Sequence, residues 1–142
     1  MDTSYVERNR DSQARLRDVL TRLSDDDLIR ALPDGWTVAD TLAHLAFYDR
    51  RAAILLARFA REGVFPSPYD YDTINEGLPY LTRLIPPRAV VAETLAAAEA
   101  ADQAAAATPE GLIAEIRSGN QVKLDRSEHR NNHLIDIEAL LG

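Results

Sequence analysis

Apolar residues recur at helical spacing along most of the chain, and no stretch alternates apolar with polar residues as a half-buried strand does. Residues 3–23 carry a narrow apolar stripe among Arg, Asp and Gln residues, which predicts a first long helix. The spacing predicts a second long helix over 38–61, a third through the Ala-rich segment 86–107, and a last one that begins near Gln121. Four long helices without strands favour an all-α four-helix bundle.

Capping residues mark the ends of two predicted helices. Ser24 is followed by three aspartates, so it is a candidate N-cap for a short helix over 24–31. Thr37 is the candidate N-cap of the second long helix, and Asp40 is placed to complete a capping box with it. Gly63 is a natural C-cap for the same helix. The sequence therefore defines both ends of the second long helix.

The connections between the long helices hold shorter elements. Two prolines and three aromatic residues in 64–72 predict a loop that crosses one end of the bundle. A helix is expected over 73–84, with Asn75 as a helix-start residue, and a short helical turn is expected over 110–116. The predicted fold is a four-helix bundle with short extra helices in its connections, and one domain spans residues 1–142.

Composition and charge exclude several classes of protein. Hydrophobic residues make up 46% of the 142 residues and charged residues 27%, which is ordinary for a globular protein and argues against disorder. The net charge of −7 disfavours a nucleic-acid partner, because phosphate binding needs clustered Lys and Arg. Adjacent cations such as Arg50-Arg51 are interpreted as a solvated helix face. We therefore expect no nucleic-acid partner.

Cysteine content and the amino-terminal segment bear on location. The chain has no cysteine, so a disulfide framework, a thiolate metal site and a cysteine nucleophile are all excluded. Any thiol chemistry needs a thiol from solution. The amino-terminal segment is too charged for a signal peptide, and no apolar run approaches the roughly 18 residues of a membrane span. We therefore expect a cytoplasmic protein without a membrane partner.

The chain has three histidines, His44, His129 and His133, and each lies on a predicted long helix. His129 and His133 are four residues apart, so both imidazoles project from one face of the last helix. The same stripe carries the apolar residues Val122 and Ile137, which must face the interior. Histidine is the commonest side-chain metal ligand, so the trio predicts a metal site. The alternative is that each histidine is an ordinary interior residue.

Three neutral imidazoles leave an open coordination position, which is typical of a catalytic metal site. A water in that position has its pKa lowered toward about 7, so the site can supply hydroxide, polarise a carbonyl or bind a thiolate. Imidazole suits zinc and nickel, and also iron and copper, so ligand type alone does not select the ion. The expected cofactor is a divalent transition metal, with zinc or nickel favoured, joined by a low-molecular-weight thiol if thiol chemistry occurs.

Other side chains are candidates for supporting roles. Tyr48 lies one turn after the first histidine and is the candidate substrate-binding residue, whereas packing is the simpler role for Trp36. A metal-bound imidazole usually donates its second N–H to a carboxylate or carbonyl, and the candidate carboxylates are Asp40, Glu128 and Asp136. Each has a simpler explanation, since Asp40 already caps a helix and the other two can face solvent.

Two segments of the sequence resemble a known family. Residues 35–45 read GWTVADTLAHL, and residues 129–133 read HRNNH. Together they resemble the DinB superfamily of four-helix metal-binding proteins, in which a W-[ST]-x-x-D-x-x-x-H-L segment supplies one ligand and an H-x3-H pair supplies two. The resemblance implies that His44, His129 and His133 form the metal triad.

The middle of the chain is similar to one branch of that superfamily, the DfsB/ClbS-like proteins. Tyr71-Asp72, Asn75 and the helix expected after Pro86-Pro87 carry this similarity, so the resemblance spans nearly the whole chain. The superfamily includes thiol-dependent isomerases and transferases that use mycothiol, bacillithiol or glutathione, and hydrolases that open a reactive cyclopropane ring. Other members have no assigned activity.

Three functions are compatible with these features. The first expectation is a metal-dependent enzyme that activates a thiol or water at the three-histidine site for transfer to, or hydrolysis of, a small electrophilic substrate. The second is a metal-binding or stress-related four-helix protein without turnover, in which the ion ties the second and last long helices together. The third is a metal-free bundle that acts as an interaction or ligand-binding module. Self-association as a homodimer is compatible with each.

Overall fold

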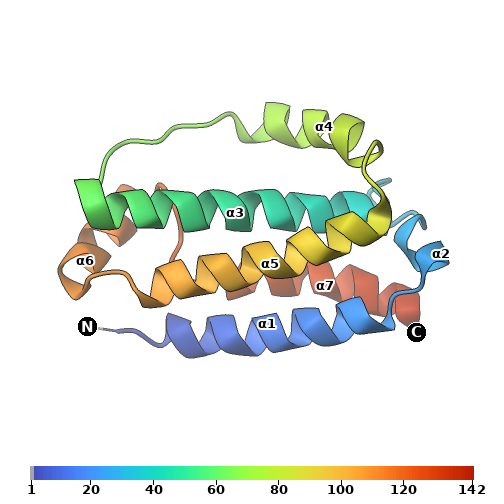
Figure 1. Cartoon of the computed structure of the whole chain (residues 1–142), viewed down its shortest axis with the longest axis horizontal. Coiled ribbons are helices and arrows are strands. Elements are labelled where there is room, and N and C mark those ends of the chain that lie inside the picture. Colours follow the sequence, from blue (N-terminus) through green and yellow to red (C-terminus); the bar gives the residue numbers. More distant parts are fainter. Residues whose placement is uncertain (1) are drawn as a thin grey trace.

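Four long helices lie side by side in the structure, a computed structural model that describes residues 2–142 (Figure 1). They are α1 (Tyr5–Arg22), α3 (Val38–Glu62), α5 (Pro87–Ala106) and α7 (Ser127–Leu141). Three shorter helices lie in the connections, namely α2 (Asp25–Leu28), α4 (Tyr71–Thr82) and α6 (Glu110–Gly119). The predicted all-α bundle with extra helices in its connections is therefore confirmed.

The sequence also predicts neither strands nor membrane-spanning segments. Within residues 2–142 the β structure is limited to an isolated bridge between Ala31 and Thr37. In the same part of the chain, no helix combines the length and the apolar character needed to cross a membrane.

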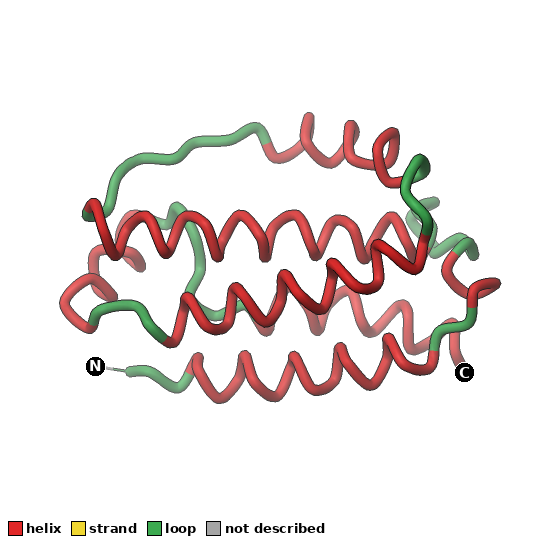
Figure 2. Tube along the Cα trace, in the orientation of Figure 1, coloured by secondary structure: helices red, strands yellow, loops and turns green. Residues whose placement is uncertain are grey.

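The path of the chain explains where α4 lies. In Figure 1, α1 and α7 run in one direction, and α3 and α5 run in the opposite direction. Because α3 and α5 are parallel, the chain has to return along the bundle between them, and residues 63–70 with α4 make this return outside α3 (Figure 2). The expected loop across one end of the bundle instead follows α3 lengthwise. The return places α4 beside the first half of α3.

Hydrogen-bonded caps define the start of α3. The Thr37 hydroxyl accepts a hydrogen bond from the Asp40 backbone N–H, and the Asp40 carboxylate accepts one from the Thr37 N–H, each at 3.0 Å. This is the capping box that the sequence predicts. Ser24 caps α2 in the same way with Asp27, and Gly63, at φ 87°, follows the last turn of α3. The register of the helix that carries the first histidine is thereby set.

The interior consists of two apolar clusters with a polar layer between them. One cluster packs at the end of the bundle near α2, and the other packs near α6. The layer between them holds polar side chains from all four long helices, with one from the N-cap of α7. They are Asn9, Ser12, Asp49, Asp102, Arg126 and Arg130. We call these six residues the polar layer.

The last helix begins later than the sequence predicts. The expected start is near Gln121, but α7 begins at Ser127. The Arg126 backbone N–H donates to Asn9 Oδ1 at 2.7 Å, which ties the preceding segment to α1 in an irregular path. Val122 therefore packs in the apolar cluster near α6 from outside the helix, and it does not continue the stripe of the histidines.

Candidate metal centre

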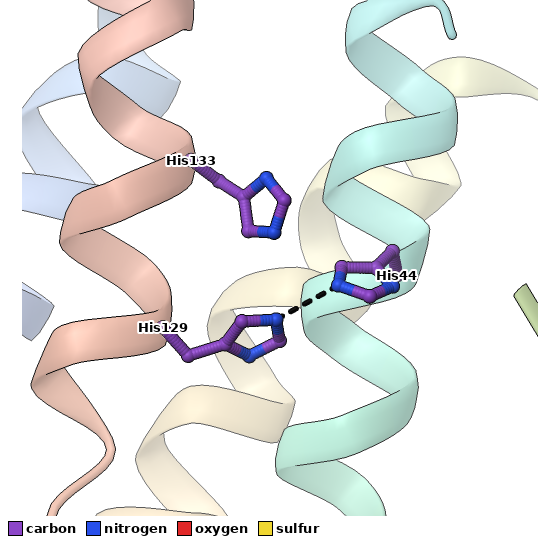
Figure 3. Close-up of side chains that lie close together, drawn as sticks. All are labelled: His44, His129 and His133. Atoms are coloured by element: carbon purple, nitrogen blue, oxygen red, sulfur yellow. Dashed lines mark hydrogen bonds between the residues drawn. The ribbon is translucent and has the colours of Figure 1, made fainter. Parts of the chain in front are cut away.

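Three histidines from two helices converge inside the bundle (Figure 3). His44 projects from α3, and His129 and His133 project from α7. One ring nitrogen from each lies within 4.8 Å of the others, and the ring centroids are 4.8, 4.9 and 5.0 Å apart. Within residues 2–142 this is the one group of His, Cys, Asp or Glu side chains placed to hold a metal. The predicted trio is therefore brought together, and its role as a ligand set stays a prediction.

The three imidazoles are neutral bases in this environment. Burial, with a smaller contribution from the neighbouring imidazoles, lowers the pKa of His44 to about 4 and the pKa of His129 to about 3. Burial also lowers the pKa of His133. At neutral pH each ring therefore keeps one unprotonated nitrogen, and His44 Nε2 lies 2.8 Å from His129 Nε2, within hydrogen-bond distance. Uncharged nitrogen atoms from three imidazoles are a ligand type that suits a divalent transition metal.

His44 is held on its other side by α4. Its Nδ1 lies 3.1 Å from Asn75 Oδ1, and the Tyr48 hydroxyl donates to the same oxygen at 3.1 Å. The sequence suggests Asn75 as a helix-start residue, but α4 begins at Tyr71 with Asp70 as its N-cap, so Asn75 lies one turn inside. The contact depends on the return path of the chain, which no local pattern reveals. The one pointer in the sequence is that Asn75 lies in a segment that carries the family resemblance.

The three carboxylates considered as imidazole partners have other roles. Asp40 is buried, caps α3 and accepts a hydrogen bond from Arg83 at 3.2 Å. Glu128 is exposed and lines a pocket beside the triad. Asp136 is exposed and acts on His133 through its charge, which raises the pKa against the larger effect of burial. In the described part of the chain, an amide and not a carboxylate is the partner of the triad.

A pocket of about 340 Å³ opens beside the triad. Its lining includes His129, the tyrosines Tyr48, Tyr69 and Tyr71, and residues of the 120–126 segment. The Tyr48 ring lies 5.3 Å from the Tyr71 ring and 6.0 Å from the Tyr69 ring, between centroids. Burial raises the pKa of Tyr48 to about 12, so its hydroxyl keeps its proton. The residue expected to bind substrate thus lies between the triad and the pocket.

Arg51 is anchored in this pocket and does not form the solvated helix face that the sequence suggests. Its guanidinium carbon lies 4.2 Å from the centre of the Tyr69 ring. Its nitrogens donate to the backbone carbonyls of Gln121 at 3.0 Å and Ser67 at 2.9 Å. These partners are neutral, so the positive charge remains available to an anionic group. Lys123, the single lysine of the chain, also lines the pocket.

The polar layer next to the triad pairs its own charges. Arg130 is fully buried and donates to Asp49 at 3.1 Å and to Asp102 at 2.7 and 2.9 Å. Arg126 donates to Asp49 at 2.9 Å. The sequence does not reveal this network, because arginines are mostly exposed and the burial of these two depends on carboxylates from other helices. The two arginines flank His129 along the chain, so the network helps to hold the first turn of α7.

Comparisons with known proteins agree with the resemblance carried by the sequence. No curated protein and no solved structure matches the chain. The family model described as mycothiol maleylpyruvate isomerase N-terminal domain matches residues 9–130, a range that includes His44 and His129 and ends before His133. This family is part of the DinB superfamily, which confirms the predicted superfamily, while the DfsB/ClbS-like branch stays a prediction. The chain belongs to the mycothiol maleylpyruvate isomerase N-terminal domain family.

Proposed function

We propose that the protein is a metal-dependent enzyme that activates a thiol or a water at the three-histidine site for attack on a small electrophile. The observation that carries the proposal is the convergence of three neutral imidazoles beside a pocket of small-molecule size. In this proposal His44, His129 and His133 hold a divalent transition metal, with zinc or nickel favoured. The family match supports a thiol-related, metal-associated chemistry.

The residues around the triad suit this chemistry. When bound, the metal would supply a Lewis acid that lowers the pKa of a coordinated thiol or water. The Tyr48 hydroxyl donates a hydrogen bond to Asn75, so it presents only a lone pair to a ligand, and its ring lies 5.0 Å from the His44 ring, between centroids. Arg51 and Lys123 place positive charge in the pocket, where it can bind an anionic substituent of the electrophile.

The thiol in this proposal comes from solution. The chain has no cysteine, and the name of the matching family includes mycothiol. The proposed co-substrate is therefore a low-molecular-weight thiol such as mycothiol, bacillithiol or glutathione. The second substrate is a small electrophile that enters the tyrosine-lined pocket.

Metal analysis tests the first half of the proposal. Protein purified without an affinity tag is loaded with zinc or nickel, dialysed and measured by elemental analysis. We expect one equivalent in the wild type and in Ile135→Ala, which alters an exposed residue on the same helix. We expect about a tenth of that amount or less in His133→Ala, because one of three ligands is lost. Full metal content in His133→Ala contradicts the proposal.

Turnover tests the second half. The loaded protein is incubated with each of the three thiols, and without thiol, against a panel of epoxides, activated alkenes and cyclopropanes. We expect turnover that requires the metal, that His133→Ala loses, and that Ile135→Ala retains. Turnover that persists after chelation would remove the triad from the reaction.

A second candidate function is metal binding without turnover. The observation in its favour is that α3 and α7 share a much smaller interface than α3 and α5, so an ion held by α3 and α7 would tie the bundle together. This function predicts stoichiometric metal and a large fall in melting temperature on chelation, with no reaction for any pair of thiol and electrophile. The enzyme proposal predicts a reaction under the same conditions.

A further inference from the structure

One residue of α4 reaches the metal centre from outside the core of the bundle. The helix lies along the outer side of α3 and fully buries only Pro79 and Thr82 (Figure 1). Asn75 is half-buried, and its Oδ1 lies 3.1 Å from His44 Nδ1 and 3.1 Å from the Tyr48 hydroxyl. Two polar contacts therefore join this amide to α3.

The two contacts determine where His44 carries its proton. An amide oxygen accepts hydrogen bonds and cannot donate one. The Tyr48 hydroxyl must therefore donate, and His44 must carry a proton on Nδ1. A neutral imidazole holds one ring proton, so His44 Nε2 is left with its lone pair. Nε2 is the atom that faces His129 at 2.8 Å, so this tautomer is the one that a metal at the triad requires.

We propose that Asn75 is a positioning residue that fixes the tautomer and ring orientation of His44, while Tyr48 holds the amide in place. This inference rests on the proposed metal site and assigns a part of it to α4. The competing role is structural, with Asn75 only attaching α4 to α3. The His44 tautomer separates the two roles, because attachment alone does not require a proton on Nδ1.

The test compares Asn75→Asp with Asn75→Leu in metal-free protein. Both replacements are close to Asn in size, but Asp keeps an oxygen acceptor and Leu removes it. Long-range 1H–15N NMR spectra report which nitrogen of an imidazole carries the proton. We expect the Nδ1–H form of His44 in the wild type and in Asn75→Asp, and a shift toward the Nε2–H form in Asn75→Leu. The control is Glu76→Ala, an exposed neighbour on α4, which keeps the wild-type spectrum.

Zinc affinity is the second readout. Loss of an outer partner of a ligating histidine weakens metal binding by about 10- to 100-fold, so the dissociation constant should rise by that factor in Asn75→Leu. Asn75→Asp and Glu76→Ala should stay within about threefold of the wild type. An Nε2–H tautomer of His44 in the wild type would overturn the inference, as would an unchanged tautomer and affinity in Asn75→Leu.

The two readouts also separate this inference from the proposed function. If the wild type binds no zinc, the proposed function fails, while the NMR comparison still decides whether Asn75 sets the tautomer. If Asn75→Leu does not fold, Asn75→Ala takes its place, because alanine also removes the acceptor and favours a helix.

Discussion

Two polar clusters lie next to each other inside the bundle, and they are built in opposite ways. In the polar layer, Arg126 and Arg130 face Asp49 and Asp102, so each charge has an opposite charge within hydrogen-bond distance. In the triad, three bases with lowered pKa values face one another. Both clusters link α3 to α7, so they occupy similar positions in the bundle and differ in how their charges are balanced.

This difference indicates that the polar layer serves the stability of the fold, whereas the triad is suited to bind a ligand. A buried ion pair is satisfied within the protein, and removal of one partner leaves an unpaired charge in the interior. Three uncharged imidazoles have no opposite charge among themselves, and a bound cation would complete the cluster. We therefore expect changes to the polar layer to reduce stability, and changes to the triad to act mainly through protons and metal.

The largest effect is expected when the polar layer is broken. Asp49→Asn removes the carboxylate charge between Arg126 and Arg130 with little change in volume. We expect the free energy of unfolding to fall by about 3–5 kcal/mol, measured by urea denaturation of metal-free protein. Glu93→Gln, which breaks an exposed pair with Arg50, is the control and should cost about 0–1 kcal/mol. If the free energy of unfolding falls no more in Asp49→Asn than in the control, the polar layer is not needed for stability and the contrast between the two clusters is wrong.

A smaller loss of stability is expected when the pH falls and the triad becomes protonated. The folded state holds the pKa of His44 at about 4 and that of His129 at about 3, whereas an unfolded histidine titrates near 6.5. The unfolded chain therefore binds more protons below pH 6.5. The contribution of these two neutral imidazoles to the stability of the metal-free protein is fully present above pH 6.5. It is lost as the pH falls toward the folded pKa values. Between pH 7.5 and 5 the loss is up to about 2 kcal/mol for each of these imidazoles.

Urea denaturation at pH 7.5, 6.5 and 5.0 measures this dependence. His129→Asn is the matched variant, because its side chain is uncharged at every pH and of similar size. We expect the variant to lose less stability than the wild type over the same range. Identical pH profiles would place the source of the dependence outside the triad.

Metal should stabilise the protein through the triad alone. An ion that binds only the folded state adds about 2.7 kcal/mol when its free concentration exceeds the dissociation constant by 100-fold. We expect the melting temperature to rise with zinc or nickel and to return to its starting value with a chelator. His129→Asn should show no rise, because it removes one of the three nitrogens. An equal rise in the variant would move the ion to another place on the protein.

The features that the sequence predicts are those decided within one helix. Helical spacing gives the long helices, and the capping box at Thr37 and Asp40 involves residues three positions apart. The shared face of His129 and His133 is likewise a matter of spacing, and the family resemblance adds His44 from another helix. The convergence of the three histidines follows from these local features together with the antiparallel course of α3 and α7.

The features that the sequence misses depend on contacts between distant segments. Asn75 reaches His44 because the chain returns outside α3. Arg130 is buried because Asp49 and Asp102 approach it from two other helices, and nothing near it in the sequence marks that pairing. The first turn of α7 is displaced because Asn9, on α1, accepts the backbone N–H of the residue before it.

The smallest effect is expected from Tyr48→Phe, which removes one of the two donors to Asn75 Oδ1. One neutral hydrogen bond contributes about 0.5–1.5 kcal/mol, and the amide keeps its second donor, so we expect the free energy of unfolding to fall by about 1 kcal/mol. Tyr80→Phe, at a side chain that is 81% exposed, should leave it unchanged in the same urea titration. A loss of about 3 kcal/mol or more would be as large as the loss expected on breaking the buried ion pairs. The hydrogen bonds around the triad would then contribute to stability as much as to chemistry.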